Sequence, residues 1–277
     1  MIDCNIYNSD DPVEQLGSCL EVLDKIDEEI SSKELHLDMR NTNWVTPFTA
    51  LILSNKIIQS MPKVSYIRIS GPKNKEVYSY LSSIGFPLGK KEKGYTYSPI
   101  NHFTKDANKA ANMVFDLINT TFPDILKGST IKYIISEFCD NVEQHSRFTN
   151  ASIMAQYYKK KNYVDIGIID DGISIPYLFE KKRIKFKEDA EAIDKALHGT
   201  STKNEDGRGK GLVSTKDIVE KGLKGHFYIV SRNGMVTMEH GRDRKLYKFT
   251  DSSLKGTLGY IRFQVPKKEV SWEQYIK

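Results

Sequence analysis

The sequence predicts an α/β protein with two parts: a small α/β domain over residues 1–100 and a layered α/β sandwich with a mixed sheet over residues 101–277. Two observations predict this fold class. In the first part short strand patterns alternate with helical ones, whereas in the second part helical patterns come early and strand patterns late. The stretch 89–101 mixes lysine, glycine and proline, and it marks the boundary.

The first part begins with helical spacing over residues 13–30, followed by an alternating, strand-like segment at 34–39. A second helix is predicted over 47–61, where a proline suits the first helical turn. A strand at 64–70 and a helix over 75–86, ended by a glycine, complete this part.

The second part begins with two helical patterns, around 105–119 and 129–146, which are followed by two strand patterns at 150–158 and 163–170. A polar glycine-bearing stretch comes next, then a short helix at about 211–221, and finally strand-like pieces that end with 257–266. Helices that gather before strands favour a layered sandwich with a mixed sheet.

Composition narrows the class of protein. The 277 residues, 39% of them hydrophobic, suffice for one large or two ordinary domains. No apolar run approaches the roughly 18 residues of a membrane span, and the N-terminus is polar, so we expect a cytoplasmic protein. Three scattered cysteines favour reduced thiols over a disulfide or zinc framework. The net charge of +5 comes partly from lysine runs, which are more typical of solvated loops than of nucleic-acid binding.

The predicted helix at 129–146 carries a row of polar side chains beside its apolar stripe. The row comprises Glu137, Asn141, Gln144 and His145, which fall within roughly a quarter of the helix circumference. A carboxylate there can accept a proton, and an amide oxygen one turn later can complete a magnesium shell together with phosphate oxygens. A solvated helix face is the alternative.

Two further stretches suggest a ligand. Asp170 ends an apolar strand and precedes Gly172, whose backbone can approach a ligand, although Asp-Gly also suits a simple turn. Residues 199–212, GTSTKNEDGRGKGL, bring glycines directly before a helix, where free N–H groups bind phosphate. The stretch is neither a Walker loop nor a dinucleotide GxGxxG, so a flexible loop remains the alternative.

Taken in this order, four motifs resemble those of the GHKL superfamily of ATP-binding domains, and the resemblance covers about 101–277. The motifs are Glu137-x-x-x-Asn141-x-x-x-His145, Asp170-x-Gly172, Gly207-x-Gly209-x-Gly211-Leu212 and Gly256-Thr257. The resemblance implies a Bergerat-type sandwich that binds Mg²⁺ and ATP. It implies Glu137 as general base, Asn141 as the magnesium ligand and Asp170 as the adenine contact. The other implied nucleotide contacts are His145, Gly172, Lys203, Gly207, Arg208, Gly209, Lys210, Gly211, Leu212 and Thr257.

The chain departs from the GHKL pattern at two positions. Ser174 stands where the first glycine motif usually has a second glycine, and Gln144 stands where many histidine kinases have lysine. The ending VEQHS looks closer to the anti-sigma-factor serine kinase branch.

The first part resembles, over residues 35–57, the STAS domains of anti-sigma-factor antagonists. By that resemblance Pro47 occupies the phosphoacceptor position, and only Thr46 and Thr49 nearby carry hydroxyls. This implies a degenerate STAS-like domain used for docking or regulation, with a generic small α/β domain as the alternative.

The sequence therefore predicts a nucleotide-controlled switch with slow ATPase or protein-kinase chemistry, which acts on a protein partner and whose oligomeric state, a homodimer included, is left open. A noncatalytic nucleotide-binding module and a nucleic-acid-remodelling GHKL ATPase are the alternatives. We also expect residues 177–210 to form a lid that closes over the phosphates, with 180–189 solvated.

Overall fold

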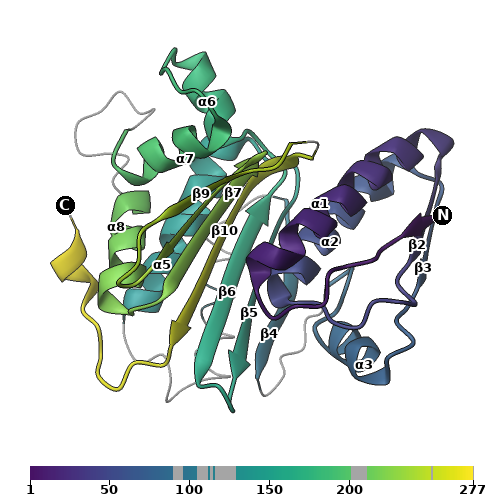
Figure 1. Cartoon of the computed structure of the whole chain (residues 1–277), viewed down its shortest axis with the longest axis horizontal. Coiled ribbons are helices and arrows are strands. Elements are labelled where there is room, and N and C mark those ends of the chain that lie inside the picture. The colour runs from purple at the N-terminus through teal and green to yellow at the C-terminus, as the bar shows by residue number, and fades with distance from the viewer. Residues whose placement is uncertain are drawn as a thin grey trace.

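The computed structural model of the chain describes residues 1–89, 96–104, 112, 115, 129–200, 211–250 and 252–276. These residues form two β-sheets joined and covered by helices (Figure 1). The smaller sheet has three parallel strands in the order β1-β2-β3, and the larger has seven strands in the order β4-β5-β6-β10-β7-β8-β9. The predicted α/β class is confirmed.

The N-terminal unit alternates strands and helices as predicted. Its elements are β1 (Ile2–Asp3), α1 (Pro12–Glu29), β2 (Glu34–Asp38), α2 (Pro47–Ser60), β3 (Tyr66–Ser70) and α3 (Lys75–Ser83). Local chemistry fixes the helix starts: the Asp11 carboxylate accepts a hydrogen bond from the Val13 amide at 2.8 Å, and Asn74 caps α3 in the same way. Strand β1 was not predicted, because two residues are too short to show an alternating pattern.

The predicted mixed sheet is wrong, because all six neighbouring strand pairs of the larger sheet are antiparallel. Its strands are β4 (Tyr97–Phe103), β5 (Ala151–Tyr158), β6 (Tyr163–Asp170), β7 (His226–Arg232), β8 (Gly234–Glu239), β9 (Lys245–Lys248) and β10 (Leu254–Gln264). A helical crossover leads from β6 to β7, which run parallel to each other. The last strand, β10, lies between them and is antiparallel to both, so no parallel pair forms.

Helices of the C-terminal part pack on one face of this sheet. They are α5 (Ser129–Asn141), α6 (Ile175–Lys181), α7 (Asp189–Leu197) and α8 (Gly211–Asp217), with a 3-10 helix at Trp272–Tyr275. α5 and α8 each continue as a π-helical turn, Val142–Ser146 and Ile218–Gly222. The α-helical row therefore ends at Asn141, and Gln144 lies in the wider π-turn. Most of the helix predicted at 105–119 lies outside the described residues.

The prediction of a lid over 177–210 is wrong for residues 189–197. Residues 189–197 form α7, whose Ala190, Ile193 and Leu197 are buried in the hydrophobic core. These three positions form an apolar stripe along the helix. The stripe is short and charged residues surround it, so the sequence of this stretch does not predict a buried helix. Residues 201–210 of the predicted lid lie outside the described residues.

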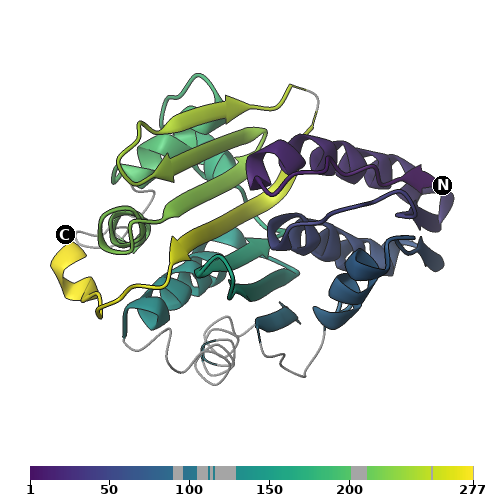
Figure 2. The same ribbon diagram turned by 60° about the horizontal axis from the view of Figure 1, so that its bottom comes forward.

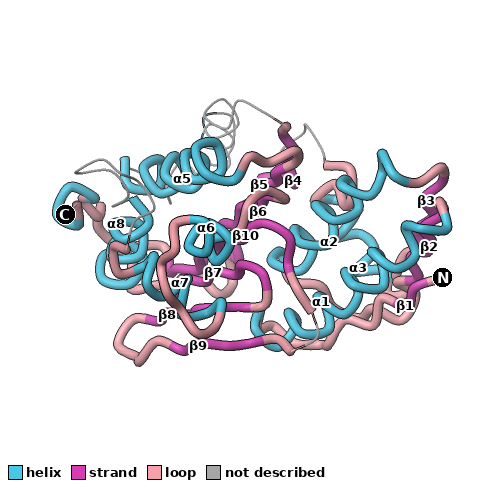
Figure 3. The backbone as a smooth tube through the Cα atoms, turned by 90° about the horizontal axis from the view of Figure 1, so that it is seen from above, coloured by secondary structure: helices cyan, strands magenta, loops and turns pink. Residues whose placement is uncertain are grey.

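The larger sheet is covered on both faces, as the view in Figure 3 shows. Helices α5, α7 and α8 lie on one face, and α1 and α2 of the N-terminal unit lie on the other. Gly167 on β6 allows the close approach of α2, since a Cβ there would lie 2.9 Å from a Leu51 methyl group. One hydrophobic core therefore joins the N-terminal unit to the sheet.

A buried polar network also crosses this junction. His102 on β4 contacts the Ser152 hydroxyl at 2.7 Å and the Pro87 carbonyl at 2.8 Å, while the Ser152 hydroxyl contacts the Asn55 side chain at 2.8 Å. Burial lowers the pKa of His102, so the neutral imidazole is favoured. Strand β4 begins at Tyr97 and belongs to the larger sheet.

The three cysteines are buried and unpaired, as the scattered spacing predicted. Burial raises the pKa of the Cys4 thiol to about 12, which keeps this side chain a protonated core residue. Across the described residues, no helix combines the length and the apolar character that crossing a membrane requires.

Candidate functional site

A cavity lies between the larger sheet and helices α5 to α8. Its volume is about 120 Å³. Measured in the same way, one water molecule occupies roughly 10–15 Å³, so the cavity has room for several waters or a small ligand group. The sheet contributes Ile168, Asp170, Ile229, Thr257 and Gly259, α5 and its π-turn contribute Phe138, Asn141, Val142 and Ser146, and the remaining lining residues are Ile173, Ile175, Leu178, Phe179, Ala196, Thr200 and Leu212. The cavity is thus an apolar slot with a few polar groups, which is the usual composition of a small-molecule site.

Among the described residues that line this slot, Asp170 is the one with an ionisable side chain, and it comes from the end of β6. The residue is 3% exposed, and burial raises the pKa of its carboxyl group to about 7. Hydrogen bonds to the carboxylate, such as the one that the Gly172 amide donates at 2.8 Å, lower the pKa but do not offset the effect of burial. A buried carboxyl group that titrates near neutrality is typical of functional sites. Its partners leave it able to accept a further hydrogen bond from a ligand.

Two glycines let the backbone close around Asp170. A Cβ at Gly172 would lie 2.0 Å from the Ser146 carbonyl oxygen, and one at Gly256 would lie 2.1 Å from the Asp170 carbonyl oxygen. Gly256 also has a φ of +86°, which other residues adopt only with strain. Both glycines predicted from the motifs are therefore required by the shape of the site.

Ser174, which replaces the second glycine of the first motif, has a local structural role. Its hydroxyl accepts a hydrogen bond from the Tyr177 amide at 3.3 Å and caps α6. Together with Pro176 in the first turn, it is a helix-start signal that could have predicted α6 from the sequence.

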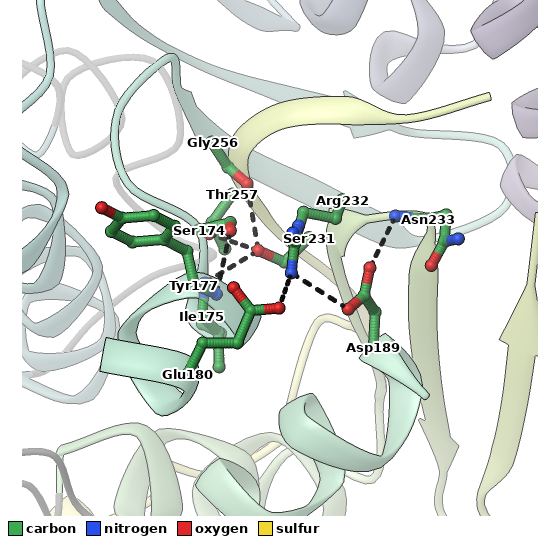
Figure 4. A network of polar contacts seen from close by, with 10 residues as sticks. All are labelled: Ser174, Ile175, Tyr177, Glu180, Asp189, Ser231, Arg232, Asn233, Gly256 and Thr257. Atoms are coloured by element: carbon green, nitrogen blue, oxygen red, sulfur yellow. Dashed lines mark hydrogen bonds and ion pairs between the residues drawn. The ribbon is translucent and has the colours of Figure 1, made fainter. Parts of the chain in front are cut away.

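Thr257 is supported by Ser231 on the neighbouring strand β7, as Figure 4 shows. Their hydroxyl oxygens lie 2.9 Å apart, and the Ser231 hydroxyl also accepts a hydrogen bond from the Ile175 amide at 3.1 Å. The adjacent Arg232 pairs with Glu180 on α6 at 2.6 Å and with Asp189 on α7 at 3.4 Å. No sequence pattern indicates this network, which holds α6 and α7 against strand β7, the neighbour of the strand that carries Thr257.

Glu137 and Asn141 lie one turn apart on α5, on the side that faces the cavity and α8. Asn141 lines the cavity itself. The Glu137 carboxylate lies against the start of α8, since a Cβ at Gly211 would be 1.6 Å from its Oε2. The structure thus brings the predicted helical motif into contact with the end of the predicted glycine-rich motif.

Asp171, which follows Asp170, is already engaged by the protein. Its carboxylate accepts hydrogen bonds from the amides of Thr149 at 2.7 Å and Asn150 at 2.9 Å. Asp171 therefore fixes the turn before β5. Of the two adjacent aspartates, Asp170 is the one that lines the cavity.

Several predicted site residues are not placed. Lys203, Gly207, Arg208, Gly209 and Lys210 lie outside the described residues, and so does the His145 side chain. Asn141, Asp170, Leu212 and Thr257 line the cavity. Glu137, Gly172 and Gly211 do not line it, but Gly172 lies against the lining residue Ser146, and Glu137 lies against Gly211. Within the described ranges, no group of three or more His, Cys, Asp and Glu side chains is arranged to hold a metal ion.

The two hydroxyls near the position suggested for phosphoacceptance in the first part are inaccessible. Thr46 is 1% exposed and Thr49 is 0% exposed, and both donate hydrogen bonds to the Gln15 side-chain oxygen, at 3.0 and 2.8 Å. They hold the start of α2 against α1, which is a structural role.

No protein-family model matches the chain, and no curated protein matches it.

Proposed function

We propose that the protein is a Mg·ATP-binding regulator of the GHKL type, with slow ATPase or protein-kinase chemistry directed at a protein partner. The observation that carries the proposal is the buried Asp170 carboxyl on an apolar cavity beside Asn141 and Glu137. An adenine ring needs such a combination, because its faces are apolar and its exocyclic amine donates hydrogen bonds.

Adenine selection follows from the acceptor character of Asp170. Its carboxylate can accept a hydrogen bond from the exocyclic amine of adenine, whereas guanine presents a carbonyl oxygen at that position. Two acceptors face to face leave both unpaired, which costs about 1–3 kcal/mol. Thr257, held by Ser231, supports the same end of the cavity.

Magnesium would be bound through Asn141 and phosphate oxygens. Mg²⁺ commonly keeps several waters and takes one or two protein ligands when substrate phosphates supply the others. Mg·ATP, when bound, supplies a phosphoryl group activated for transfer. Glu137 is the carboxylate we assign as general base, because it lies one turn from Asn141 and against Gly211.

The test is incubation of the purified chain with Mg²⁺ and γ-labelled ATP, with separation of free phosphate, labelled chain and labelled candidate partner. We expect slow release or transfer of the label, and we expect Glu137→Gln to lower the rate about 10²–10⁴-fold without changing the ATP dissociation constant. Binding without turnover in the wild type would favour the noncatalytic module. Absence of ATP binding would overturn the proposal.

A further inference from the structure

The chain segment after β10 returns to the helices that carry the proposed catalytic groups (Figure 2). At the start of α5, the Thr130 hydroxyl donates a hydrogen bond to the Val270 carbonyl, and the Trp272 indole N–H donates to the Ser129 hydroxyl at 2.8 Å. At the π-turn that extends α8, Gly222 allows close contact, since a Cβ there would lie 2.9 Å from a Val270 methyl group. Residues 270–275 therefore bridge α5 and α8.

The main contact of this segment is an aromatic stack. The rings of Trp272 and Tyr133 lie 4.5 Å apart between centroids, with an angle of 13° between their planes. Stacked aromatic pairs of this kind attract each other beyond the effect of the area that they bury. Because Trp272 is also tied to Ser129, the stack fixes the orientation of the Tyr133 ring.

The fixed ring directs its hydroxyl toward Glu137. Tyr133 precedes Glu137 by four residues, so the two side chains share one face of α5. The pKa of the Tyr133 hydroxyl is raised, first by burial and then by the negative charge of Glu137. On α5, Glu137 thus follows the oriented Tyr133 by one turn, and its carboxylate lies close to Gly211 at the start of α8.

We propose that Tyr133, oriented by its stack on Trp272, is a positioning residue for Glu137. The inference rests on the proposed function, in which Glu137 accepts a proton during phosphoryl transfer. A hydrogen bond from the Tyr133 hydroxyl would restrict the rotamer of the Glu137 side chain and so fix where its carboxylate points. Trp272 then acts on catalysis through Tyr133, although neither side chain lines the described cavity.

The test compares Tyr133→Phe, which keeps the ring and removes the hydroxyl, with Tyr275→Phe as the matched control. Tyr275 belongs to the same segment, and its ring packs on Gly222, at the end of the π-turn, whereas Glu137 lies near Gly211 at the start of α8. In the full chain we expect Tyr133→Phe to lower kcat for phosphate release or transfer roughly 10–100-fold with an unchanged ATP dissociation constant. Trp272→Leu, which keeps the hydroxyl but frees the ring, should lower kcat by less, and Tyr275→Phe should match the wild type.

A second readout requires no nucleotide. In protein labelled with ¹³C at the glutamate carboxyl carbon, the Glu137 resonance, assigned with Glu137→Gln, should shift in Tyr133→Phe and stay in place in Tyr275→Phe. An unchanged resonance together with an unchanged kcat would overturn the role of Tyr133 and leave the proposed function standing. A wild-type chain that neither binds nor turns over ATP would overturn both.

Discussion

The two faces of the seven-stranded sheet differ in what they bury. On the face toward the N-terminal unit, Phe48 packs edge-on against Tyr260, with 5.1 Å between the ring centroids, and both side chains are fully buried. On the opposite face the helices leave a cavity that ends in the buried Asp170. Alternation along β6 produces this difference, since Ile169 belongs to the first core and Ile168 to the second. One face is therefore packed throughout, whereas the other combines packing with a cavity, which is the proposed ligand site.

The largest effect that separates the faces is expected at Phe48. Phe48→Ala removes a fully buried ring from the junction of α2 with the sheet. It should lower the free energy of unfolding by about 3–5 kcal/mol, measured by urea denaturation without nucleotide. Below the unfolding transition, the ATP affinity of the folded protein should not change, because the cavity is lined from the other face.

Phe179→Ala is the matched variant on the cavity face. Phe179 is 2% exposed and lines the cavity, so its loss should lower both stability and ATP affinity. Equal loss of affinity in the two variants would show that the faces are not functionally separate.

A smaller effect is expected at Asp170, with a sign that depends on pH. Its pKa is about 7 in the folded protein and about 4 in an unfolded chain. Between these values the folded state binds more protons, so this group's contribution to stability falls as pH rises from about 4 to 7. Asp170→Asn removes the buried charge and should stabilise the nucleotide-free protein by about 1–3 kcal/mol at pH 8.5 but little at pH 5.

Thermal melts of wild type and Asp170→Asn at the two pH values provide the measurement. A constant difference in melting temperature would mean that Asp170 does not carry a buried charge at high pH. The stability gained by the variant would show that the wild-type carboxyl is retained for a ligand and not for folding.

The smallest effect concerns the metal. Asn141→Ala should weaken binding of Mg·ATP by roughly tenfold while leaving metal-free ATP nearly unchanged, because only the contact through the metal is lost. Titrations with magnesium and with a chelator make the comparison. If Asn141→Ala weakened ATP binding equally with magnesium and with the chelator, Asn141 would contact the nucleotide or the cavity wall and not the metal.

Local patterns in the sequence predicted most elements, and the misses have physical causes. The predicted strand at 163–170 is confirmed with both of its bounds. Its apolar pattern and the turn residues on either side of it both indicate the same strand. The insertion of β10 between β6 and β7 was not predicted, because strand order depends on contacts between segments far apart in the chain. Helix α7 was overlooked because two of its buried positions are small alanines among charged residues.

The sequence of α2 also indicates where the N-terminal unit lies. Helix α2 buries nearly its whole circumference, including the polar Ser54 and Asn55, because it lies between the two sheets. Its sequence, PFTALILSNKII, is apolar on several sides, which is typical of a helix covered by two layers. For the site, the motifs located Asn141, Asp170 and Thr257, whereas Ser231 and Arg232 act through contacts that no motif spacing reveals.

The most direct test of the central claim is the relative affinity of the wild-type chain for ATP and GTP. Isothermal titration calorimetry at pH 8, with excess magnesium, would use each nucleotide in turn. If Asp170 accepts a hydrogen bond from the adenine amine, ATP should bind at least roughly 5- to 100-fold more tightly, which corresponds to about 1–3 kcal/mol. Equal affinities for ATP and GTP would contradict the assignment of this cavity as an adenine site.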